Sequence, residues 1–167
     1  MLTVVSDTHS NAGHALTDRT LEAVRTADRV IHAGDFTSVS ALEAFQDLVT
    51  RLDAVHGNAD AAAVRDRLPD ARILDWAGLR IAVTHRQNGG STGLAMFGRE
   101  RGADLVVSGH SHAPSVTRTD DLTLLNPGSH DQPRGNRLGH AELERHGTGV
   151  RGRLRQPDGT VIEEFSL

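Results

Sequence analysis

Apolar residues recur along this chain in two rhythms. Short runs rich in Val, Leu and Ile are typical of strands, whereas apolar residues spaced three or four apart are typical of helices. The predicted helices span residues 17–26, 38–51, 60–68 and 92–101, with Thr17 and Asp60 as N-caps. The predicted strands span residues 2–5, 29–32, 54–56, 71–76, 79–83, 104–107, 116–118, 122–125 and 160–165, with further strand structure across 141–154.

The order of these elements indicates the fold class. Strands alternate with helices in the first half, and strands dominate the second half, where Gly78 and Asp120-Asp121 mark hairpins and Pro157-Asp158-Gly159 marks a turn. This order predicts a layered α/β domain built on mixed sheets. No linker, repeat or low-complexity tract divides the chain, so we expect one domain over residues 1–167 with no cap domain.

Composition excludes several classes of protein. The absence of Cys excludes disulfides and thiolate metal sites, and all eighteen basic side chains are Arg. The net charge of −4 and the lack of a basic block argue against a general nucleic-acid binder. The N-terminus lacks the pattern of a signal peptide and no apolar run could span a membrane, so we expect a soluble cytoplasmic protein.

Residues that ligate metals follow five of the predicted strands. They supply two carboxylates, one amide and four imidazoles, and no thiol. The segments are Asp7-Thr8-His9, Gly34-Asp35, Gly57-Asn58, Thr84-His85 and Gly109-His110-Ser111-His112. Because ligands bind beyond the carboxyl ends of strands in open α/β sheets, we expect these side chains to meet.

The spacing and chemistry of these residues favour a pair of metal ions. Asp7 and His9 are two residues apart, so in extended backbone they point to the same side, and His110 and His112 have the same relation. The glycines before Asp35, Asn58 and His110 let the backbone turn sharply. Oxygen and imidazole ligands suit Mn, Fe, Co, Ni or Zn. Asp35 lies in the middle of the set and is our candidate for a carboxylate bridging two ions.

The ordered motifs resemble the calcineurin-like metallophosphoesterase superfamily, and more closely its small, cap-less phosphodiesterases of the YfcE type. The resemblance covers roughly residues 1–135. It rests on the five segments above, on Ser6-Asp7-Thr8-His9-Ser10-Asn11 and Gly57-Asn58-Ala59-Asp60 around two of them, and on Asn126-Pro127-Gly128-Ser129 followed by Pro133-Arg134.

The resemblance implies a fold, a ligand set and a reaction. The fold would be two packed mixed β-sheets flanked by helices. One metal would take Asp7, His9, Asp35 and His112, and the other Asp35, Asn58, His85 and His110. A hydroxide bound to the two ions would attack phosphorus in line, with Asp35, Asn58 and His85 acting through it. Mn²⁺ is the first choice of ion by this resemblance, with Ni²⁺, Co²⁺, Zn²⁺ or Fe²⁺ as alternatives.

This chain departs from the family pattern in two places, after Asn58 and after His85. Many members of the superfamily carry a His after the Asn of the third motif, and here that position is Ala59. His14, Asp60 and His130 are then the candidates for protonating the leaving group. Asn11 and Arg134 are candidate contacts to substrate phosphate. The segment after His85, Arg86-Gln87-Asn88, differs from the Gly and His common in the family.

The other histidines have simpler explanations than metal binding. His32 lies within an apolar strand and is expected to be a satisfied core residue, and His56 is expected to occupy a strand position beside the site. His140 and His146 flank a charged stretch, which predicts a solvated face.

We therefore predict a metal-dependent phosphodiesterase acting on a small phosphodiester. The alternative from another class is a non-catalytic protein-binding scaffold, because a retromer subunit resembles the same fold, although its site is depleted in ligands. A phosphomonoesterase is disfavoured by Ala59. A nuclease stays open, with nucleic acid as substrate only, but one Trp and no Tyr offer little stacking surface. A homo-oligomer is compatible with the sequence.

Overall fold

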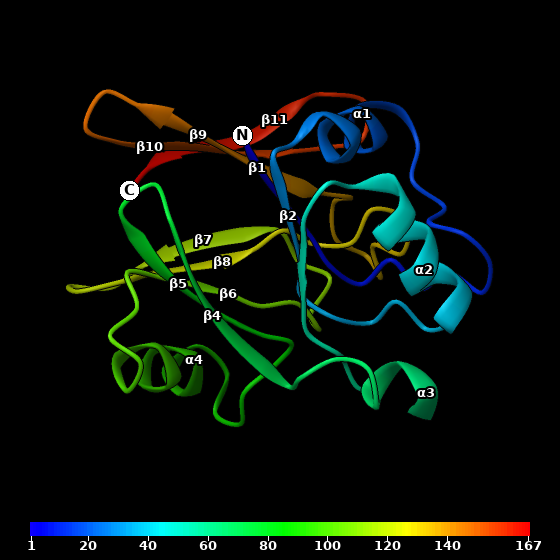
Figure 1. The fold of residues 1–167 in the computed structure, drawn as a ribbon. Coiled ribbons are helices and arrows are strands. Elements are labelled where there is room, and N and C mark those ends of the chain that lie inside the picture. The colour runs from blue at the N-terminus through cyan, green and yellow to red at the C-terminus, as the bar shows by residue number, and fades with distance from the viewer.

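Two mixed β-sheets form the centre of the fold in the computed structural model, which describes residues 1–167 (Figure 1). The six-stranded sheet has the order β11-β10-β9-β1-β2-β3, and the five-stranded sheet has the order β4-β5-β6-β8-β7. The strands of the first sheet are β1 (Leu2–Val5), β2 (Arg29–His32), β3 (Leu52–Ala54), β9 (His140–His146), β10 (Gly149–Arg155) and β11 (Val161–Ser166). Those of the second are β4 (Ala71–Trp76), β5 (Leu79–Thr84), β6 (Leu105–Val107), β7 (Ser115–Arg118) and β8 (Thr123–Asn126).

Parallel pairing occupies one side of the six-stranded sheet, up to the edge strand β3, and the middle of the five-stranded sheet. Strands β1, β2 and β3 run parallel to one another, as do β5, β6 and β8, whereas all other pairs are antiparallel. Leu2 faces Arg29 across the β1–β2 pair, and Ile81 faces Leu105 across the β5–β6 pair. The parallel strands therefore deliver their following loops to one end of each sheet.

Alternating side chains of the central strands enter two different cores. Leu2, Val4 and Ile31 face the second sheet and meet Ile81 and Val83 between the layers. This inter-sheet core is completed from the C-terminal strands by Leu143, Val150, Leu154 and Phe165. Because both faces of the central strands are covered, these strands are apolar at consecutive positions instead of alternating with polar residues.

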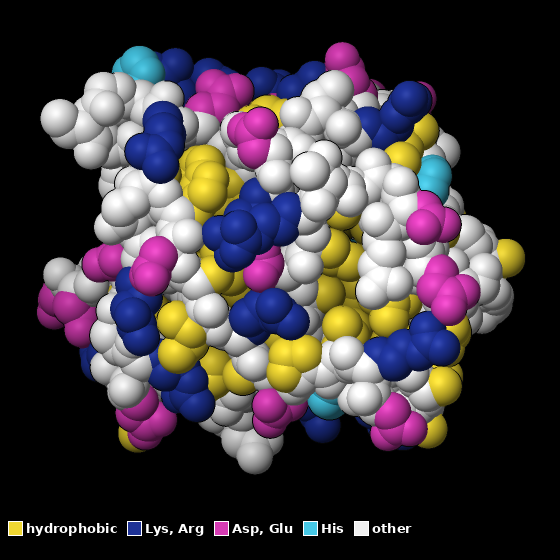
Figure 2. Space-filling model, in the orientation of Figure 1, with side chains coloured by type: hydrophobic (Ala, Val, Ile, Leu, Met, Phe, Trp, Pro, Cys, Tyr) yellow, Lys and Arg dark blue, Asp and Glu magenta, His cyan; other side chains and the backbone are white.

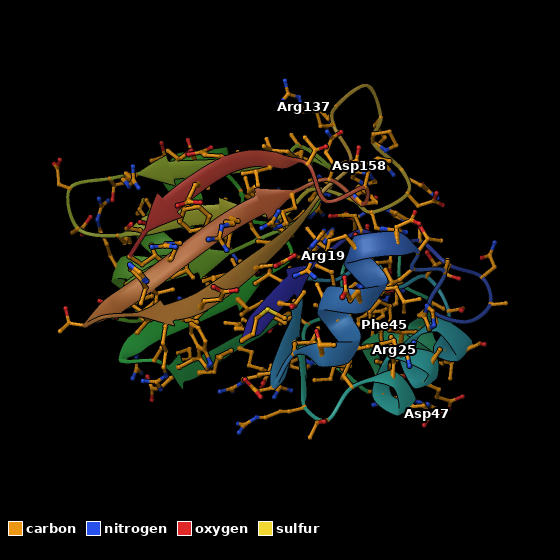
Figure 3. The ribbon with its side chains drawn as sticks, turned by 90° about the horizontal axis from the view of Figure 1, so that it is seen from above. Arg19, Arg25, Phe45, Asp47, Arg137 and Asp158 are labelled. Carbon is orange, nitrogen blue, oxygen red and sulfur yellow. The ribbon has the colours of Figure 1, made fainter.

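The helices cover the outer faces of the two sheets. Helices α1 (Asp18–Thr26), α2 (Val39–Leu48) and α3 (Ala62–Arg65) lie on the six-stranded sheet, and α4 (Gly90–Arg99) lies on the five-stranded sheet (Figures 1 and 3). Phe45 of α2 packs with Val5 and Val30 on the first face, whereas Phe97 of α4 packs with Ala82 on the second. The predicted α/β architecture of two packed mixed sheets with flanking helices is confirmed.

Several predicted boundaries are wrong for local reasons. The region 141–154 is two strands, because Gly147 takes a φ of 60° and turns β9 into β10. The third strand is β3, which begins at Leu52 and ends before the predicted residues 55–56. Helix α2 ends at Leu48 and not at 51, since Val49 is already extended. Helix α3 begins at Ala62, so Asp60 is not its N-cap, and Thr17 stands at the N-cap of α1 without a side-chain hydrogen bond.

Candidate metal centre

The predicted ligand residues lie just beyond five strands drawn from both sheets. Asp7 and His9 follow β1, Asp35 follows β2, and Asn58 follows β3 in the six-stranded sheet. His85 follows β5, and His110 and His112 follow β6 in the five-stranded sheet. The two sheets thus supply the candidate site from opposite sides of the inter-sheet core.

One group of side chains consists of Asp7, His9 and His112. The Nε2 atom of His112 lies 3.3 Å from Asp7 Oδ1 and 3.2 Å from His9 Nε2. His9 Nε2 is 3.9 Å from the same Asp7 oxygen. Ligand atoms of these three residues all lie within 4.8 Å of one another, which is compatible with a single shared ion.

A second group surrounds Asp35. His85 Nε2 lies 3.3 Å from Asp35 Oδ2 and 3.2 Å from Asn58 Oδ1. Asp35 Oδ2 is also 3.7 Å from His9 Nε2, so this single oxygen stands between the two groups. Asp7 also lies within reach of Asp35 and His85. We favour Asp35 as the bridge because its Oδ2 faces an imidazole of each group, while its Oδ1 accepts the Ala59 N–H at 2.7 Å.

His110 joins the second group less closely. Its ring centre is 5.3 Å from that of His85, and its backbone N–H donates to both oxygens of Asp7, at 3.2 and 3.0 Å. All seven predicted ligands are therefore gathered in one region, with His110 linking the two groups through its backbone as well.

Backbone carbonyl groups set the orientation of two imidazoles. His85 Nδ1 is 2.8 Å from the Ala33 carbonyl oxygen, and His112 Nδ1 contacts the carbonyl oxygen of Gln132. A carbonyl can only accept, so Nδ1 carries the proton in both rings. The Nε2 lone pairs are left to point into the cluster, which is the tautomer that a metal ligand needs.

The ligand loops have an unusual backbone. Five of the seven residues take left-handed φ values: Asp7 at 54°, His9 at 45°, Asp35 at 63°, His110 at 70° and His112 at 57°. The expectation that each Asp-x-His or His-x-His pair would converge from extended backbone is wrong. Left-handed backbone is costly for residues with a Cβ and is concentrated at functional sites.

Two of the glycines that were predicted to allow sharp turns instead allow a carboxylate to lie close to the backbone. A Cβ on Gly57 would stand 2.1 Å from Asp35 Oδ1, and one on Gly109 would stand 2.6 Å from Asp7 Oδ2. Only Gly34, at a φ of 97°, also uses the left-handed backbone. Glycine at these positions is what allows the loops to press against the carboxylates.

The charges of the cluster are incompletely balanced. The side chains of Asp7 and Asp35 are 0% and 3% exposed, and neither forms an ion pair with an Arg. Burial alone would raise the pKa of Asp35, but hydrogen bonding and attraction from His85 lower it below its usual value. For His85, burial lowers the pKa and Asp35 outweighs this, so the net shift is upward. Buried carboxylates without guanidinium partners need a cation, and the residues present fit one or two divalent ions.

Asp60, predicted as an N-cap and as a candidate proton donor, instead supports the backbone of this site. Its Oδ2 accepts the N–H groups of Asp35 at 3.1 Å and of Gly57 at 2.7 Å, and its Oδ1 accepts that of Thr37 at 2.7 Å. The buried carboxylate thus ties the Asp35 loop to the Asn58 loop. The only signal in the sequence was its position two residues after Asn58.

The remaining histidines divide between the core and the surface. His32 is buried and stacks on Phe36, with Nδ1 accepting the Gly34 N–H and Nε2 facing Thr8, so its prediction as a core residue is confirmed. The prediction of a solvated face is wrong for His140, which is fully buried between Glu142 and Thr20. His146 is exposed, as predicted. His56 lies beyond β3 and lines a cavity beside Asn58, so it does not occupy a strand position.

The two predicted substrate contacts both lie on exposed loops. Asn11 is exposed and follows the His9 segment. Arg134 is exposed in left-handed backbone at a φ of 48°. Burial is the main cause of a lowered pKa at His9, and the positive charge of Arg134 adds to that lowering.

Two cavities adjoin the cluster on either side of Arg86 and Gln87. One, of about 230 Å³, is lined by His110, by serine hydroxyls and by Leu94, Leu124 and Leu125. The other, of about 320 Å³, is lined by Asn58, His85 and further polar residues. Both share His85, so space for substrate is continuous with the second ligand group.

Comparison with known proteins places the chain in a family. Residues 1–144 match the model of the calcineurin-like phosphoesterase superfamily domain. The chain belongs to this superfamily. Its members are metal-dependent phosphoester hydrolases, and five of the clustered side chains group as candidate metal ligands of such an enzyme: Asp7, His9, Asp35, His85 and His112.

Relatives of the chain support this assignment. A probable metallophosphoesterase of Methanothermobacter thermautotrophicus is 32% identical over 138 residues, covering 80% of this chain and 79% of the relative. A phosphodiesterase of Methanocaldococcus jannaschii is 24% identical over 136 residues, covering 75% and 81%. The resemblance to small calcineurin-like phosphoesterases is thereby confirmed.

Solved structures share the whole fold. A predicted phosphoesterase of Streptococcus pneumoniae matches with a TM-score of 0.74 and 24% identity, over 99% of this chain and 97% of that one. A Vps29 variant of Entamoeba histolytica matches with a TM-score of 0.81 and 19% identity, over 99% and 98%. At these identities the likeness shows the fold alone. No helix of the calcineurin-like chain has the length and hydropathy needed to cross a membrane.

Proposed function

We propose that this calcineurin-like protein hydrolyses phosphodiesters of small molecules with the help of two divalent ions, of which Mn²⁺ is the first choice. The observation that carries the proposal is the convergence of two buried carboxylates, four imidazoles and one amide at the ends of five strands. A relative named a phosphodiesterase supports the choice of diesters, as does Ala59, which leaves no imidazole after Asn58.

Each ligand residue would have a defined part. Asp7, His9 and His112 would hold one ion, Asn58, His85 and His110 the other, and Asp35 would contact both. The ions would supply Lewis acidity, lowering the pKa of water and neutralising charge on the phosphoryl oxygens. The exposed side chains of Asn11 and Arg134 would orient the phosphoryl group from the rim, Arg134 with a guanidinium suited to paired oxygens.

Turnover of bis-p-nitrophenyl phosphate with Mn²⁺, Ni²⁺, Co²⁺ and Zn²⁺ tests the proposal. We expect Asp35→Asn and His110→Ala to lower metal-stimulated kcat/KM by about a hundredfold or more, since even residues behind metal ligands cost up to that much. Asp47→Asn and His146→Ala replace exposed residues of the same types away from the cluster and serve as matched controls. Unchanged turnover in Asp35→Asn would sink the proposal.

A second candidate function is a protein-binding scaffold, which the whole-chain likeness to Vps29 favours. Turnover assays and purification of the wild-type protein distinguish the scaffold from the enzyme. If the wild type turns over neither mono- nor diesters with any of the four metals, and a stable protein partner copurifies with it, the scaffold replaces the enzyme. Preference for p-nitrophenyl phosphate over the diester would instead indicate a phosphomonoesterase, and degradation of oligonucleotides a nuclease.

A further inference from the structure

No hydrophobic residue lines the larger of the two cavities, which has a volume of about 320 Å³. Its wall includes Asn58 and His85 of the second ligand group, and the other polar lining side chains are His56, Arg65, Asp70, Thr84, Arg86 and Gln87. Any substrate whose phosphorus sits at the cluster can therefore extend directly into this polar space.

Two guanidinium groups of this cavity have no counter-ion. Arg65 and Arg86 are exposed, and neither lies within 4.0 Å of a carboxylate, although Asp70 lines the same cavity. Arg67, only two residues from Arg65, is paired with Glu43 at 2.9 Å outside the cavity. On the face that Figure 2 shows, arginine and acidic side chains are interspersed. The cavity thus has a local excess of positive charge.

A buried ring nitrogen without a hydrogen-bond partner also indicates that this cavity takes a ligand or a water molecule. His56 lines the cavity, and its Nδ1 is buried with no hydrogen-bond partner in the protein. Buried polar atoms are nearly always paired, so a ligand or ordered water is expected to complete the hydrogen bonds of this ring.

We infer that this cavity binds a second anionic group of the substrate, held by Arg65 and Arg86, so that the preferred substrates are phosphodiesters that carry an additional phosphate. The inference rests on the proposed function and narrows its substrate class. Guanidinium groups bind phosphate through paired, charge-assisted hydrogen bonds, whereas a neutral or aromatic group would find no hydrophobic side chain here. The smaller cavity, with three leucines, is the better place for an aromatic leaving group.

A matched pair of chromogenic diesters tests the inference. One probe is the p-nitrophenyl ester of thymidine 5′-phosphate, and the other is the same ester with a 3′-phosphate added. Both release nitrophenolate, so the ratio of their kcat/KM values isolates the second anion. We expect the metal-loaded wild type to prefer the 3′-phosphorylated probe by about tenfold, the size expected for one charge-assisted contact.

Variants of the cavity should change this preference in both directions. Arg65→Gln and Arg86→Gln should each reduce it to about threefold or less, because one charge-assisted contact is lost. Asp70→Asn should increase it, since a like charge is removed. Arg67→Gln, on the same segment but paired with Glu43, should leave the preference as in the wild type. A 3′-O-carboxymethyl probe shows whether any anion suffices or a phosphate is required.

The outcomes separate this inference from the proposed function. If the wild type hydrolyses both probes equally and the Arg variants behave like it, the cavity does not bind an anion, although the enzyme stands. If neither probe is hydrolysed, the proposed function fails, and calorimetry still tests whether the cavity binds an anion. In that case tighter binding of thymidine 3′,5′-bisphosphate than of thymidine 5′-phosphate, reduced in Arg65→Gln, supports the inference, and equal binding overturns it.

Discussion

At the scale of single residues, the candidate metal centre depends on groups that never touch a metal. Asp60 collects three backbone N–H groups from two loops, at distances of 2.7 to 3.1 Å. One of these loops carries Asp35 and the other carries Asn58. The left-handed φ of 63° at Asp35 is therefore maintained by a buried carboxylate from another segment of the chain.

Asp60→Asn should weaken metal binding without abolishing it. An amide has one accepting oxygen and a nitrogen that cannot accept, so at least one of the three N–H groups loses its partner. We expect metal affinity to fall by about 10- to 100-fold, the cost of altering groups behind metal ligands. Metal titration by calorimetry measures this, with the exposed Asp66→Asn as control. An unchanged affinity in Asp60→Asn would contradict the role given to Asp60.

The residues around the cluster also predict how the leaving group departs. Ala59 carries no proton, and both oxygens of Asp60 accept backbone N–H groups. His14 accepts the N–H of Leu16, and His130 that of Thr17, so neither ring is free to serve as a mobile acid. At these atoms the three predicted proton donors all act as hydrogen-bond acceptors, so none of them offers a proton there.

Rates should then depend steeply on leaving-group acidity. Without a general acid, which contributes about 10²–10⁴-fold, alkyl diesters should react slower than nitrophenyl diesters by at least that factor. A series of substituted phenyl methyl phosphates, measured at saturating metal, gives the dependence. A flat series would show that a protein group or a bound water donates the proton after all.

At the scale of elements, α1 is held to the six-stranded sheet by a buried ionic network. Arg19 of α1 donates to both oxygens of Glu142 on β9, at 2.8 and 2.7 Å (Figure 3). His140 lies 3.0 Å from the same carboxylate, and Arg155 of β10 lies 3.4 Å away. Although burial opposes its charge, His140 and Arg19 lower the pKa of Glu142 to about 2.

Glu142→Gln should destabilise the fold. The substitution removes the carboxylate that Arg19 and Arg155 share, although Arg19 keeps its ion pair with Glu22. We expect the free energy of unfolding to fall by about 2–3 kcal/mol, less than for fully buried pairs because Arg19 is partly exposed. Urea unfolding measures the change. The exposed Glu164→Gln, which removes an ion pair with Arg153, should leave the free energy of unfolding nearly unchanged.

The same carboxylate predicts how stability varies with pH. Its pKa is depressed in the folded state, so its contribution is complete above about pH 4.5, the ordinary value, and is lost as the pH falls towards 2. The stability difference between wild type and Glu142→Gln should therefore shrink between pH 5 and pH 3. Urea midpoints of both proteins across this range provide the measurement, and a constant difference would mean that Glu142 is not charged in the fold.

At the scale of the whole molecule, the candidate centre joins the two sheets. Asp7, His9, Asp35 and Asn58 follow strands of one sheet, whereas His85, His110 and His112 follow strands of the other. Ions bound between them would cross-link the layers at one end of the inter-sheet core. Metal binding would then stabilise the complete sandwich and not one loop, since neither sheet alone forms the site.

Metal removal should lower the melting temperature of the whole protein. An ion present at a hundred times its Kd stabilises the folded state by about 2.7 kcal/mol, which for a chain of this size corresponds to roughly 5–10 °C. Calorimetric scans with Mn²⁺ and with a chelator measure the shift. Asp35→Asn should lose most of it, whereas a full shift in that variant would place the stabilising ion elsewhere.

Much of this protein could be predicted from residues that are close together in the chain. The runs ending in Asp7, Asp35, His85 and His110 identify strands followed by ligands, because a buried strand must be apolar and its carboxyl end can present polar groups. The ordered motifs therefore indicated the layered fold, the family and the seven converging side chains before any contact was known.

Only the tertiary structure decided how those side chains are supported and what surrounds them. The contacts of Asp60 with Asp35 and Thr37, and the contact of the buried His140 with Thr20, join segments 23 to 120 residues apart. Packing between distant segments also brings Arg65 and Arg86 to the same cavity beside Asn58. Sequence patterns report which residues an element buries, but the partner that satisfies a buried charge or holds a strained loop comes from packing between distant segments.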